Sequence, residues 1–523
     1  MAQGPAESLT IFGEDDFAWE EFDWAGPETT TLEPAPALRP VVRRRRRQTR
    51  TLAGDLARLR AALPGPTGPL ALVAALVTVV ALAVVIRTAL GGDESPRQAD
   101  KAERTAPRAG AKLKPITVPS PRTTAVRTLE PGDEGTPVRD LQTALAALGY
   151  YAQAPDGGYG PGTSSAVATF QQAKGLAADG VAGPQTAEAL VAALVGEAEA
   201  DVDAVEDGLA AAVAGGTLPS ADADRYRSTV ADAVELLAKL PPGRSAAIAL
   251  VLNDVAAEAD AYEAPRALAA FSMLAATADF VSDHAVPASS ADIEDADGVV
   301  YRYYHAHGFQ FQPLANFAKL NGLVRKGEKA EVRRLADALV ARGVPAGDAL
   351  AWEYYFPFGG PSRWTSGLAQ SAGAQALARA GRMLGDPTIL RKARAAYRTI
   401  PQSLSMPLGG GLWVREYGFS DMPILNAQLQ SIVSLNEYTD ITGDAGAGDV
   451  SARMSAAARA LIAQFDTGCW SRYSLGGNPA TPAYHAYHVS LLRKLAKETG
   501  DPLWADYAER WDGYVSAGGC ATA

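Results

Sequence analysis

The sequence has few of the residues that most often bind metals. Its 523 residues include two cysteines, Cys469 and Cys520, and five histidines. No Cys-x-x-Cys or Cys–His zinc spacing occurs, which argues against a structural metal framework. Positive charge is also in deficit, and a net charge of -11 argues against a nucleic-acid-binding protein. The length predicts more than one domain, and a hydrophobic content of 47% is enough for sizeable cores.

Uncharged hydrophobic sequence is concentrated in one run, PLALVAALVTVVALAVVI at Pro69–Ile86, interrupted only by Thr78. At about 1.5 Å per residue, a helix of this length is roughly 27 Å long and just crosses a hydrocarbon core. A secretory signal peptide fits poorly, because a long segment precedes the run and no clear A-x-A cleavage site follows it. The sequence therefore predicts one transmembrane helix within residues 69–90.

Basic residues lie mainly on the N-terminal side of this run. They are Arg43–Arg47, Arg50, Arg58 and Arg60, against Arg87 and Arg97 just beyond it. The positive-inside rule then predicts a cytoplasmic N-terminus and extracytoplasmic C-terminal domains. Residues 1–68, which begin with an acidic, Pro- and Thr-rich stretch, are predicted to be a disordered cytoplasmic tail. Residues 91–128 are polar and proline-rich and are predicted to be an extended linker on the cell-wall side.

Residues 129–194 contain three helical patterns joined by two similar turns. The turns read DGGYGPGT and DGVAGPQT, and the Thr that ends each can cap the following helix. These turns and the AVATFQ helix resemble the three-helix peptidoglycan-binding module, which implies attachment to a cell-wall glycan. The resemblance implies that Asp156, Gly157 and Tyr159 line the glycan groove. As an alternative, these turn residues only support the fold.

From residue 195 onward helical patterns dominate and strand-like alternation is rare. Helical pairs are separated by turns that read LGD, TGD and ITGDAG, which indicates recurring helical hairpins. We predict a helical region over 195–300 and an α/α-toroid-like domain over 301–523. The predicted fold is therefore mainly α: a single transmembrane helix, a three-helix module and a large helical toroid. Whether residues 196–300 fold with the toroid is left open.

Aromatic-rich stretches interrupt the helical patterns of this half. They are YRYYHAHGFQFQPLANFAKLNGL, WEYYFPFGGPSRWTSGLAQ, GGGLWVREYGFSDMPILN and FDTGCWSRYSLGG. Trp, Tyr and Arg in loops suit sugars, because flat rings stack on pyranose faces and guanidinium groups pair with carboxylates.

The C-terminal part resembles the C-terminal domain of the D-glucuronyl C5-epimerases. The resemblance spans Trp364 to Tyr514 and is carried by WTSGLAQSAGAQALARA, WVREY followed by ILN, FDTGCWSRYSL, YHAYHVSLL and ERWDGY. Three positions depart from the family pattern. Arg415 stands where an acidic residue is common, Gly418-Phe419 replaces Pro-Thr, and LNA replaces LNG. These departures concern the substrate more than the chemistry.

The family resemblance implies an enzyme that epimerises C5 of a uronic acid in a glycosaminoglycan-like polysaccharide. The reaction removes the proton next to the carboxylate and returns one to the opposite face, so it needs two acid/base groups and no cofactor. By resemblance the catalytic residues are Glu416, Tyr417, Tyr473 and Tyr484. The expected substrate-binding residues are Trp364, Arg415, Asn426, Arg472, His485, His488 and Arg510. Each of these tyrosines has an alternative role as a packed aromatic residue.

A metal site is the alternative for the histidines. His485 and His488 are three residues apart on a helix, and His305 and His307 would share one side of an extended segment. No carboxylates at metal-ligand spacing accompany them, so no metal is expected. The two cysteines lie in the exported part, where a disulfide is permitted, but the sequence does not show whether they pair.

The expectation is thus a single-pass membrane protein of the cell-wall side, with peptidoglycan and a uronic-acid polysaccharide as partners and a homodimer left open. Two other functions fit the same sequence. A polysaccharide lyase begins with the same proton abstraction and then expels the C4 substituent, and a non-catalytic wall-binding protein would keep only the fold.

Overall fold

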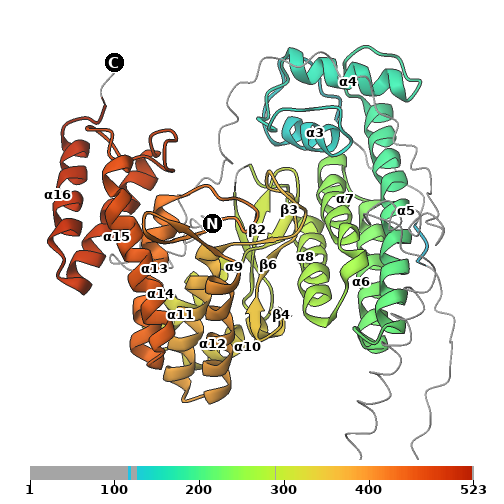
Figure 1. The fold of residues 1–523 in the computed structure, drawn as a ribbon. Helices are drawn as coiled ribbons and strands as arrows, with labels where there is room; N and C mark the ends of the chain where they lie inside the picture. Colours follow the sequence, from blue (N-terminus) through green and yellow to red (C-terminus); the bar gives the residue numbers. More distant parts are fainter. Residues whose placement is uncertain (1–115, 119–126, 289, 521–523) are drawn as a thin grey trace, which may run out of the picture. The chain divides into compact units, whose positions relative to one another are not determined.

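The computed structural model describes residues 116–118, 127–288 and 290–520, and this part of the chain is built mainly from α-helices (Figure 1). The mainly α class is thus confirmed for the described residues. The predicted cytoplasmic tail, the transmembrane helix at 69–90 and most of the linker lie outside them. None of the described helices combines the length and apolar character needed to cross a membrane.

The helices and strands follow one another along the chain as listed here. The α-helices are α3 (Thr136–Ala147), α4 (Pro161–Ala173), α5 (Pro184–Ala214), α6 (Ser220–Leu237), α7 (Pro242–Ala257), α8 (Ala264–Asp283), α9 (Pro313–Lys326), α10 (Lys329–Ala341), α11 (Gly367–Leu384), α12 (Pro387–Gln402), α13 (Leu425–Thr442), α14 (Ala445–Leu461), α15 (Pro482–Thr499) and α16 (Pro502–Ser516). The short 3-10 helices are η2 (Ala259–Ala261) and η3 (Ile462–Phe465). The strands are β1 (Asp292–Glu294), β2 (Val300–Tyr304), β3 (Gly308–Phe311), β4 (Val344–Ala346), β5 (Ala349–Ala351), β6 (Glu353–Tyr354), β7 (Trp364–Thr365), β8 (Ser405–Leu408) and β9 (Gly411–Val414).

The first module is held together by two equivalent hydrogen-bond networks. In the first turn, the side-chain amide of Gln142 donates to Asp156 Oδ1 (2.7 Å) and Thr163 Oγ1 (3.0 Å) and accepts from Gly157 N (2.8 Å). Gln171 makes the same contacts with the second turn. Its amide donates to Asp179 Oδ1 and Thr186 Oγ1 and accepts from the N–H of Gly180. The two similar turns are therefore built around a buried glutamine that approaches them from the preceding helix.

The turn threonines do not cap the helices that follow. α4 and α5 begin at Pro161 and Pro184, after Gly160 and Gly183, and no side chain caps either helix. The prediction of threonine caps was wrong, because Pro occupies the first helical position and needs no N–H partner. Each threonine instead lies inside the first turn and accepts the glutamine amide.

α5 joins this module to the next helices without a break. It is one helix of 31 residues that continues through the 194/195 boundary expected from the sequence. Its buried side chains recur along the whole length, and α5 packs on α6 and α7, while α8 packs on α6 and α7. The helical region that follows the module is therefore attached to it by a continuous helix (Figure 1).

A three-stranded antiparallel sheet, in the order β1-β2-β3, follows α8. β2 and β3 pair from Tyr301↔Phe311 to Tyr304↔Gly308, and β3 packs on α7 and α8. All of β3 and nearly all of β2 are buried, including the polar residues Arg302 and Gln310 that alternate with the aromatics. The sequence predicts only an aromatic-rich segment between helices at this place, so the hairpin was not predicted. His305 and His307 lie in its turn rather than in extended chain.

The second half consists of helical hairpins, as the sequence predicts. The pairs are α9/α10, α11/α12, α13/α14 and α15/α16, and the first helices of successive pairs pack on one another. In Figure 1 the hairpins stand side by side, with α15 and α16 at the end of the row. Short two-stranded hairpins, β4-β5, β6-β7 and β8-β9, lie between the helices.

The Gly-Asp turns between the paired helices explain this recurrence. Gly385, Gly443 and Gly500 end α11, α13 and α15 in the left-handed conformation, with φ of 64°, 68° and 68°. The aspartate that follows each glycine then accepts a hydrogen bond from the first turn of α12, α14 or α16. Glycine and aspartate are the residues preferred at these two cap positions.

Cys469 and Cys520 form a disulfide, with Cα atoms 5.0 Å apart. The bond joins the chain beyond α16 to the loop that precedes α15. The pairing question that the sequence left open is thus answered in the structure.

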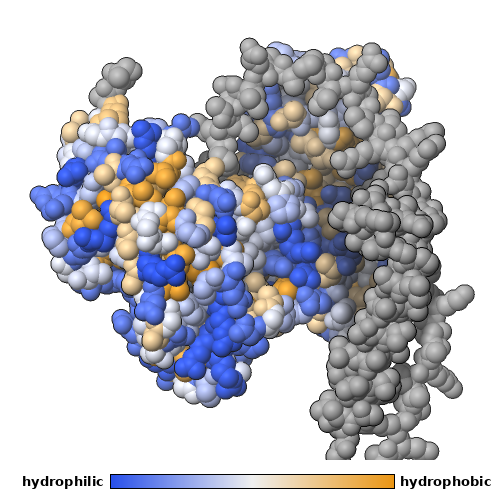
Figure 2. Space-filling model, in the orientation of Figure 1, coloured by the Kyte–Doolittle hydropathy of each residue, from blue (hydrophilic) through white to orange (hydrophobic). Residues whose placement is uncertain are grey.

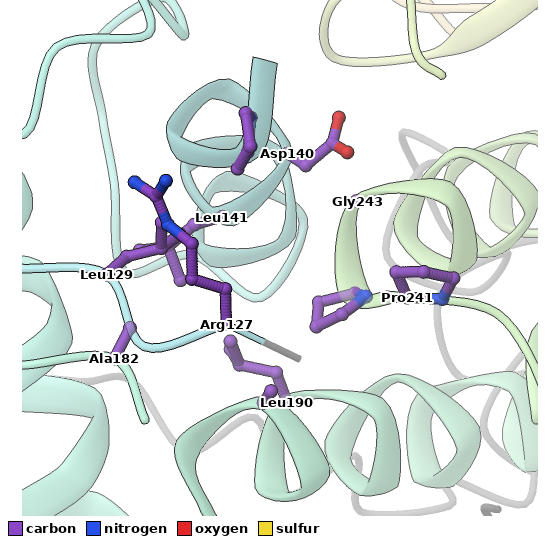
Figure 3. Close-up of a pocket in the computed structure, with 11 residues that line it drawn as sticks. Arg127, Leu129, Asp140, Leu141, Ala182, Leu190, Pro241 and Gly243 are labelled. Carbon is purple, nitrogen blue, oxygen red and sulfur yellow. The ribbon is translucent and has the colours of Figure 1, made fainter. Parts of the chain in front are cut away.

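The first module meets α7 at a close approach beside a cavity of about 230 Å³ (Figure 3). A Cβ atom on Gly243, in the first turn of α7, would lie 2.4 Å from the Cβ of Asp140 on α3. Only glycine allows this contact. Asp140 Oδ1 is buried and has no hydrogen-bond partner among the described residues. Burial therefore raises the pKa of Asp140 to about 6, although Arg244 and Arg139 act in the opposite direction.

Because of the raised pKa of Asp140, we expect the stability of the fold to depend on pH. Because the folded-state pKa is raised, the neutral form stabilises the fold fully below pH 4, and this contribution is lost as pH rises through about 6. Asp140→Asn should therefore melt at the same temperature as the wild type at pH 4 and a few degrees above it at pH 7.5. The expected gain at pH 7.5 is at most about 3 kcal/mol, because the pKa of Asp140 is shifted by about two units. Thermal melting checks this. Asp203→Asn on the exposed face of α5 is the matched control, and equal melting of Asp140→Asn and wild type at pH 7.5 would contradict the assignment.

Candidate active site

Glu416 is placed by a close contact between the start of α11 and the segment after β9. The N–H of Gly367 donates to the carbonyl of Arg415 (2.9 Å), and a Cβ on Gly367 would lie 2.4 Å from Val414 Cγ2. The glycine thus lets the two backbones touch. Ser366, the N-cap of α11, then donates its hydroxyl to Glu416 Oε1 (3.2 Å) and accepts from Ala369 N (3.1 Å).

Glu416 is a buried carboxyl with one free oxygen. Its side chain is 2% exposed, and Oε2 has no hydrogen-bond partner among the described residues. Burial raises the pKa of Glu416 to about 8, and the hydrogen bond from Ser366 offsets only part of this effect. A carboxyl group with such a pKa can both accept and donate a proton near neutral pH.

Tyr417, Tyr473 and Tyr484 meet beside Glu416, although they come from different elements. Tyr417 follows Glu416 in the chain, Tyr473 lies in the loop after η3, and Tyr484 lies in the first turn of α15. The Tyr473 and Tyr484 rings are 4.7 Å apart at 61°. The hydroxyl of Tyr473 is hydrogen-bonded to those of both Tyr417 and Tyr484, so the three phenols form a chain.

The three phenols are held in the neutral form. Burial raises the pKa of each, and the nearby Glu416 carboxylate and the other phenols raise it further. In Tyr417 and Tyr473 a hydrogen bond from a neighbouring tyrosine lowers the pKa, but burial outweighs it. The chain therefore carries hydroxyl protons that it can donate and pass along.

An aromatic group encloses one side of this cluster. Trp364 on β7 stacks on Tyr354, with ring centroids 4.1 Å apart at 4°, and donates its indole N–H to the Phe356 carbonyl (2.9 Å). Its ring lies 5.6 Å from that of Tyr417. Trp364, predicted to contact substrate, is thus 7% exposed and positions Tyr417.

Asn426, also predicted to bind substrate, lies in the first turn of α13. Its Oδ1 is buried and lacks a hydrogen-bond partner among the described residues, as does Glu416 Oε2. The neighbouring Leu425 N–H donates to the carbonyl of Tyr473 (3.1 Å), which fixes α13 against the tyrosine loop. A buried acceptor without a partner is costly in a protein interior. Both oxygen atoms are therefore candidates to accept hydrogen bonds from donor groups of a substrate.

The three predicted arginines all have protein partners. Arg415 pairs with Asp421 (2.7 Å) and donates to the carbonyls of Ser403 and Ser405, while Arg472 donates to the carbonyl of Gly477. Arg510 lies 3.4 Å from Asp466 and is half exposed. The strongest electrostatic effects on the three phenols come from Glu416 and from one another rather than from these arginines.

His485 and His488 lie behind the tyrosine loop, fully buried. His485 Nδ1 accepts from the N–H of Ser471 (3.1 Å), so its Nε2 carries the proton that is donated to the Trp511 carbonyl (2.9 Å). His488 Nδ1 contacts Ser471 Oγ (2.9 Å), and burial lowers the pKa of His488 to about 3. The two rings therefore support the fold around Ser471, and their expected contact with substrate stays a prediction.

Of the predicted glycan residues in the first module, Gly157 and Tyr159 are buried and Asp156 is exposed. Gly157 has a φ of 80°, and Asp156 accepts from Gln142 and from Gly158 N. Tyr159 is 3% exposed and donates its hydroxyl to the Gly180 carbonyl (2.8 Å). Burial raises the pKa of Tyr159 to about 12. These contacts support the turn, and a role in binding glycan stays a prediction.

The sequence reasoning missed three site residues. Ser366 and Gly367 position Glu416, and their signal was the Ser-Gly pair at the expected helix start in WTSGLAQ. Tyr354, whose pKa burial raises well above the usual value, donates its hydroxyl to Gln312 Oε1 (3.1 Å) and lies within electrostatic range of Glu416. No spacing in the sequence relates Tyr354 to Glu416.

Comparison with known families agrees with this site. Residues 347–513 match the family model described as D-glucuronyl C5-epimerase C-terminus. Residues 134–190 match the model for a putative peptidoglycan binding domain. The recognition of both families from their motifs is thus confirmed, and the first match contains Glu416 and all three tyrosines.

Curated relatives match each region separately. A D-glucuronyl C5-epimerase of Caenorhabditis elegans is 28% identical over 180 residues, which are 30% of this chain and 29% of that protein. A zinc D-Ala-D-Ala carboxypeptidase of Streptomyces albus G is 54% identical over 61 residues, which are 11% of this chain and 24% of that protein. The chain thus spans less than a third of the length of either relative.

Among solved structures, a cellobiose 2-epimerase from Bacillus thermoamylovorans is 11% identical to this chain. The match covers 52% of this chain and 76% of the epimerase chain. The TM-score is 0.34, which does not establish a common fold.

Proposed function

We propose that this chain is a membrane-tethered, cell-wall-associated C5-epimerase of a uronic-acid polysaccharide. The observation that carries the proposal is the junction of Glu416, with its free buried oxygen, and the hydrogen-bonded chain of Tyr417, Tyr473 and Tyr484. The matches to the epimerase and peptidoglycan-binding families support it.

The proposed mechanism assigns one proton-transfer group to each face of the sugar. Ionised Glu416 removes the C5 proton and becomes neutral, while a phenol of the tyrosine chain donates a proton to the opposite face of C5. The negative charge that forms on the uronate carboxylate is stabilised by hydrogen bonds from neutral hydroxyl groups. The protons removed and added are equal in number, and no electron is gained or lost, so the step requires no redox cofactor.

The proposed location follows from the order of the segments. The predicted transmembrane helix at 69–90 anchors the chain, and the module at 129–194 holds the enzyme on peptidoglycan. Sedimentation of the purified protein with insoluble peptidoglycan tests the second part, and failure to sediment would argue against a wall-binding role.

Solvent deuterium tests the activity directly. The detergent-solubilised full-length protein is incubated in D₂O with polymers of glucuronate, mannuronate or galacturonate, and C5 deuterium is measured by NMR. Deuterium at C5 without chain cleavage is the expected result. An unsaturated product, detected by ultraviolet absorbance, would show a lyase, and neither exchange nor cleavage with any polymer would contradict the enzymatic proposal.

A further inference from the structure

We propose that Phe419 forms the subsite that binds the sugar ring next to the reacting uronate and thereby helps to select the substrate. The inference rests on the proposed function, because it names a contact of that substrate. It concerns a position at which this chain departs from the family pattern, since Gly418-Phe419 stands where Pro-Thr is common.

Phe419 is the outermost member of a series of rings that leads to the reactive groups. It is 38% exposed, whereas Tyr417 is 8% and Glu416 2% exposed. The Phe419 ring lies over that of Tyr417 at 5.7 Å and 25°, and Trp364 meets it edge-on at 5.9 Å. A sugar chain whose reacting unit reaches Tyr417 would therefore place a neighbouring unit near Phe419.

Two glycines fix the position of this ring. The N–H of Gly418 donates to the Thr365 carbonyl (2.8 Å), and a Cβ on Gly418 would lie 3.0 Å from Thr365 Oγ1. A Cβ on Gly360 would lie 2.6 Å from the ring of Phe419. Phe419 therefore joins the loop before β7 to the loop after β9, and its ring is already ordered before a ligand binds.

Phe419 is unusual because large hydrophobic side chains are seldom exposed in the described part of the chain. The described chain has three large hydrophobic side chains that are exposed: Phe419, Met422 and Val515. Two of the three lie within one short loop beside Glu416. Figure 2 also shows apolar residues gathered around α13 and α15, whereas the lower ends of α11 and α12 are mainly hydrophilic. An exposed aromatic next to a buried polar site is typical of a surface that binds a partly apolar ligand such as a pyranose ring.

The same loop offers a group suited to a polyuronate. Arg415 pairs with Asp421, whose side chain is 73% exposed, so this ion pair is solvent-accessible and weak. A carboxylate of the neighbouring sugar could exchange with that of Asp421 at little cost. The occupant we infer is thus a uronate ring stacked on Phe419 within the same polysaccharide chain.

Kinetics of three Phe419 variants test the subsite. Phe419→Ala should raise KM for the polymer about 10-fold with kcat changed by less than about threefold, because an aromatic contact contributes roughly 0.5–1.5 kcal/mol and 1.4 kcal/mol corresponds to tenfold. Phe419→Trp should keep the wild-type KM, and Phe419→Leu should fall between. Val515→Ala, which removes the exposed large hydrophobic side chain on α16, is the matched control and should leave both constants unchanged. An unchanged KM in Phe419→Ala would overturn the inference.

Affinity electrophoresis in gels that contain the polymer separates this inference from the proposed function. If the wild type is retarded, Phe419→Ala is not, and no C5 exchange occurs, the subsite stands and the epimerase proposal fails. If exchange occurs and Phe419→Ala is retarded as strongly as the wild type, the epimerase proposal stands and the subsite fails. Retardation of neither protein, with no exchange, would overturn both.

Discussion

Tyr473→Phe should lower the rate of C5 deuterium exchange by at least about 10²-fold, the usual effect of removing a proton-transfer group. Tyr473 is the middle member of the phenol chain, hydrogen-bonded to both Tyr417 and Tyr484. Removing its hydroxyl interrupts proton transfer along the chain and removes its hydrogen bonds with Tyr417 and Tyr484. The ring stays, so its 4.7 Å contact with Tyr484 is kept. The measurement is NMR of C5 deuterium at saturating polymer.

A matched control is Tyr438→Phe. Tyr438 is a buried tyrosine that donates its hydroxyl to a carboxylate, Asp444 Oδ2 (3.3 Å), but it lies at the opposite end of α13 from Asn426. Its loss should lower the melting temperature and leave the exchange rate unchanged. Full exchange activity in Tyr473→Phe would remove the tyrosine chain from the mechanism.

The convergence of Glu416 with the tyrosines shows what the sequence could and could not predict. The motifs identified these four residues through a family resemblance, and the structure brings them together. Nothing in the local sequence indicates that the loop after η3 and the start of α15 meet the segment after β9. That meeting depends on backbone contacts such as Leu425 N to the Tyr473 carbonyl, which no periodicity reports.

The helices were predicted better than the strands for a physical reason. The Gly-Asp turns are local signals, because each residue acts on the helix end beside it. The strands β2 and β3 are only five and four residues long, so the alternation of Arg302 and Gln310 with aromatic residues is too short to be a strong strand signal. Both polar residues are buried, so the alternation does not separate a buried face from an exposed one. Likewise, the buried glutamines Gln142 and Gln171 contact turn residues 8–21 positions away, and they cannot be told from surface glutamines in the sequence.

Long-range packing also decides the role of the polar residues near the site. His485 and His488 were predicted to bind substrate, and in the structure their ring nitrogens contact Ser471 and Trp511. Ser366, an ordinary N-cap by sequence, instead contacts the reactive carboxyl. Proximity to a motif was therefore a weaker guide than the contacts of each polar atom.

Glu416→Gln should strongly lower exchange activity and at the same time stabilise the protein at alkaline pH. Because the pKa of Glu416 is raised to about 8, its neutral form stabilises the fold fully below about pH 4.5, and this contribution is lost as pH rises through 8. Glutamine stays neutral at every pH, so the variant should exceed the wild type at pH 9 by up to about 5 kcal/mol in free energy of unfolding. The same substitution removes the base, and exchange should fall by about 10²–10⁴-fold. Chemical denaturation at pH 6 and 9 and C5 exchange measure the two effects.

The pH dependence of exchange separates a catalytic from a structural role for Glu416. In the wild type kcat/KM should rise with pH toward a plateau above about 8, as the carboxyl ionises. Ser366→Ala removes the hydrogen bond that lowers the pKa of Glu416, so its profile should move to higher pH while activity on the plateau persists. The loss of the Ser366 cap on α11 costs about 1 kcal/mol of stability and cannot by itself move the profile. An unchanged profile in Ser366→Ala, or residual pH-dependent exchange in Glu416→Gln, would show that another group is the base.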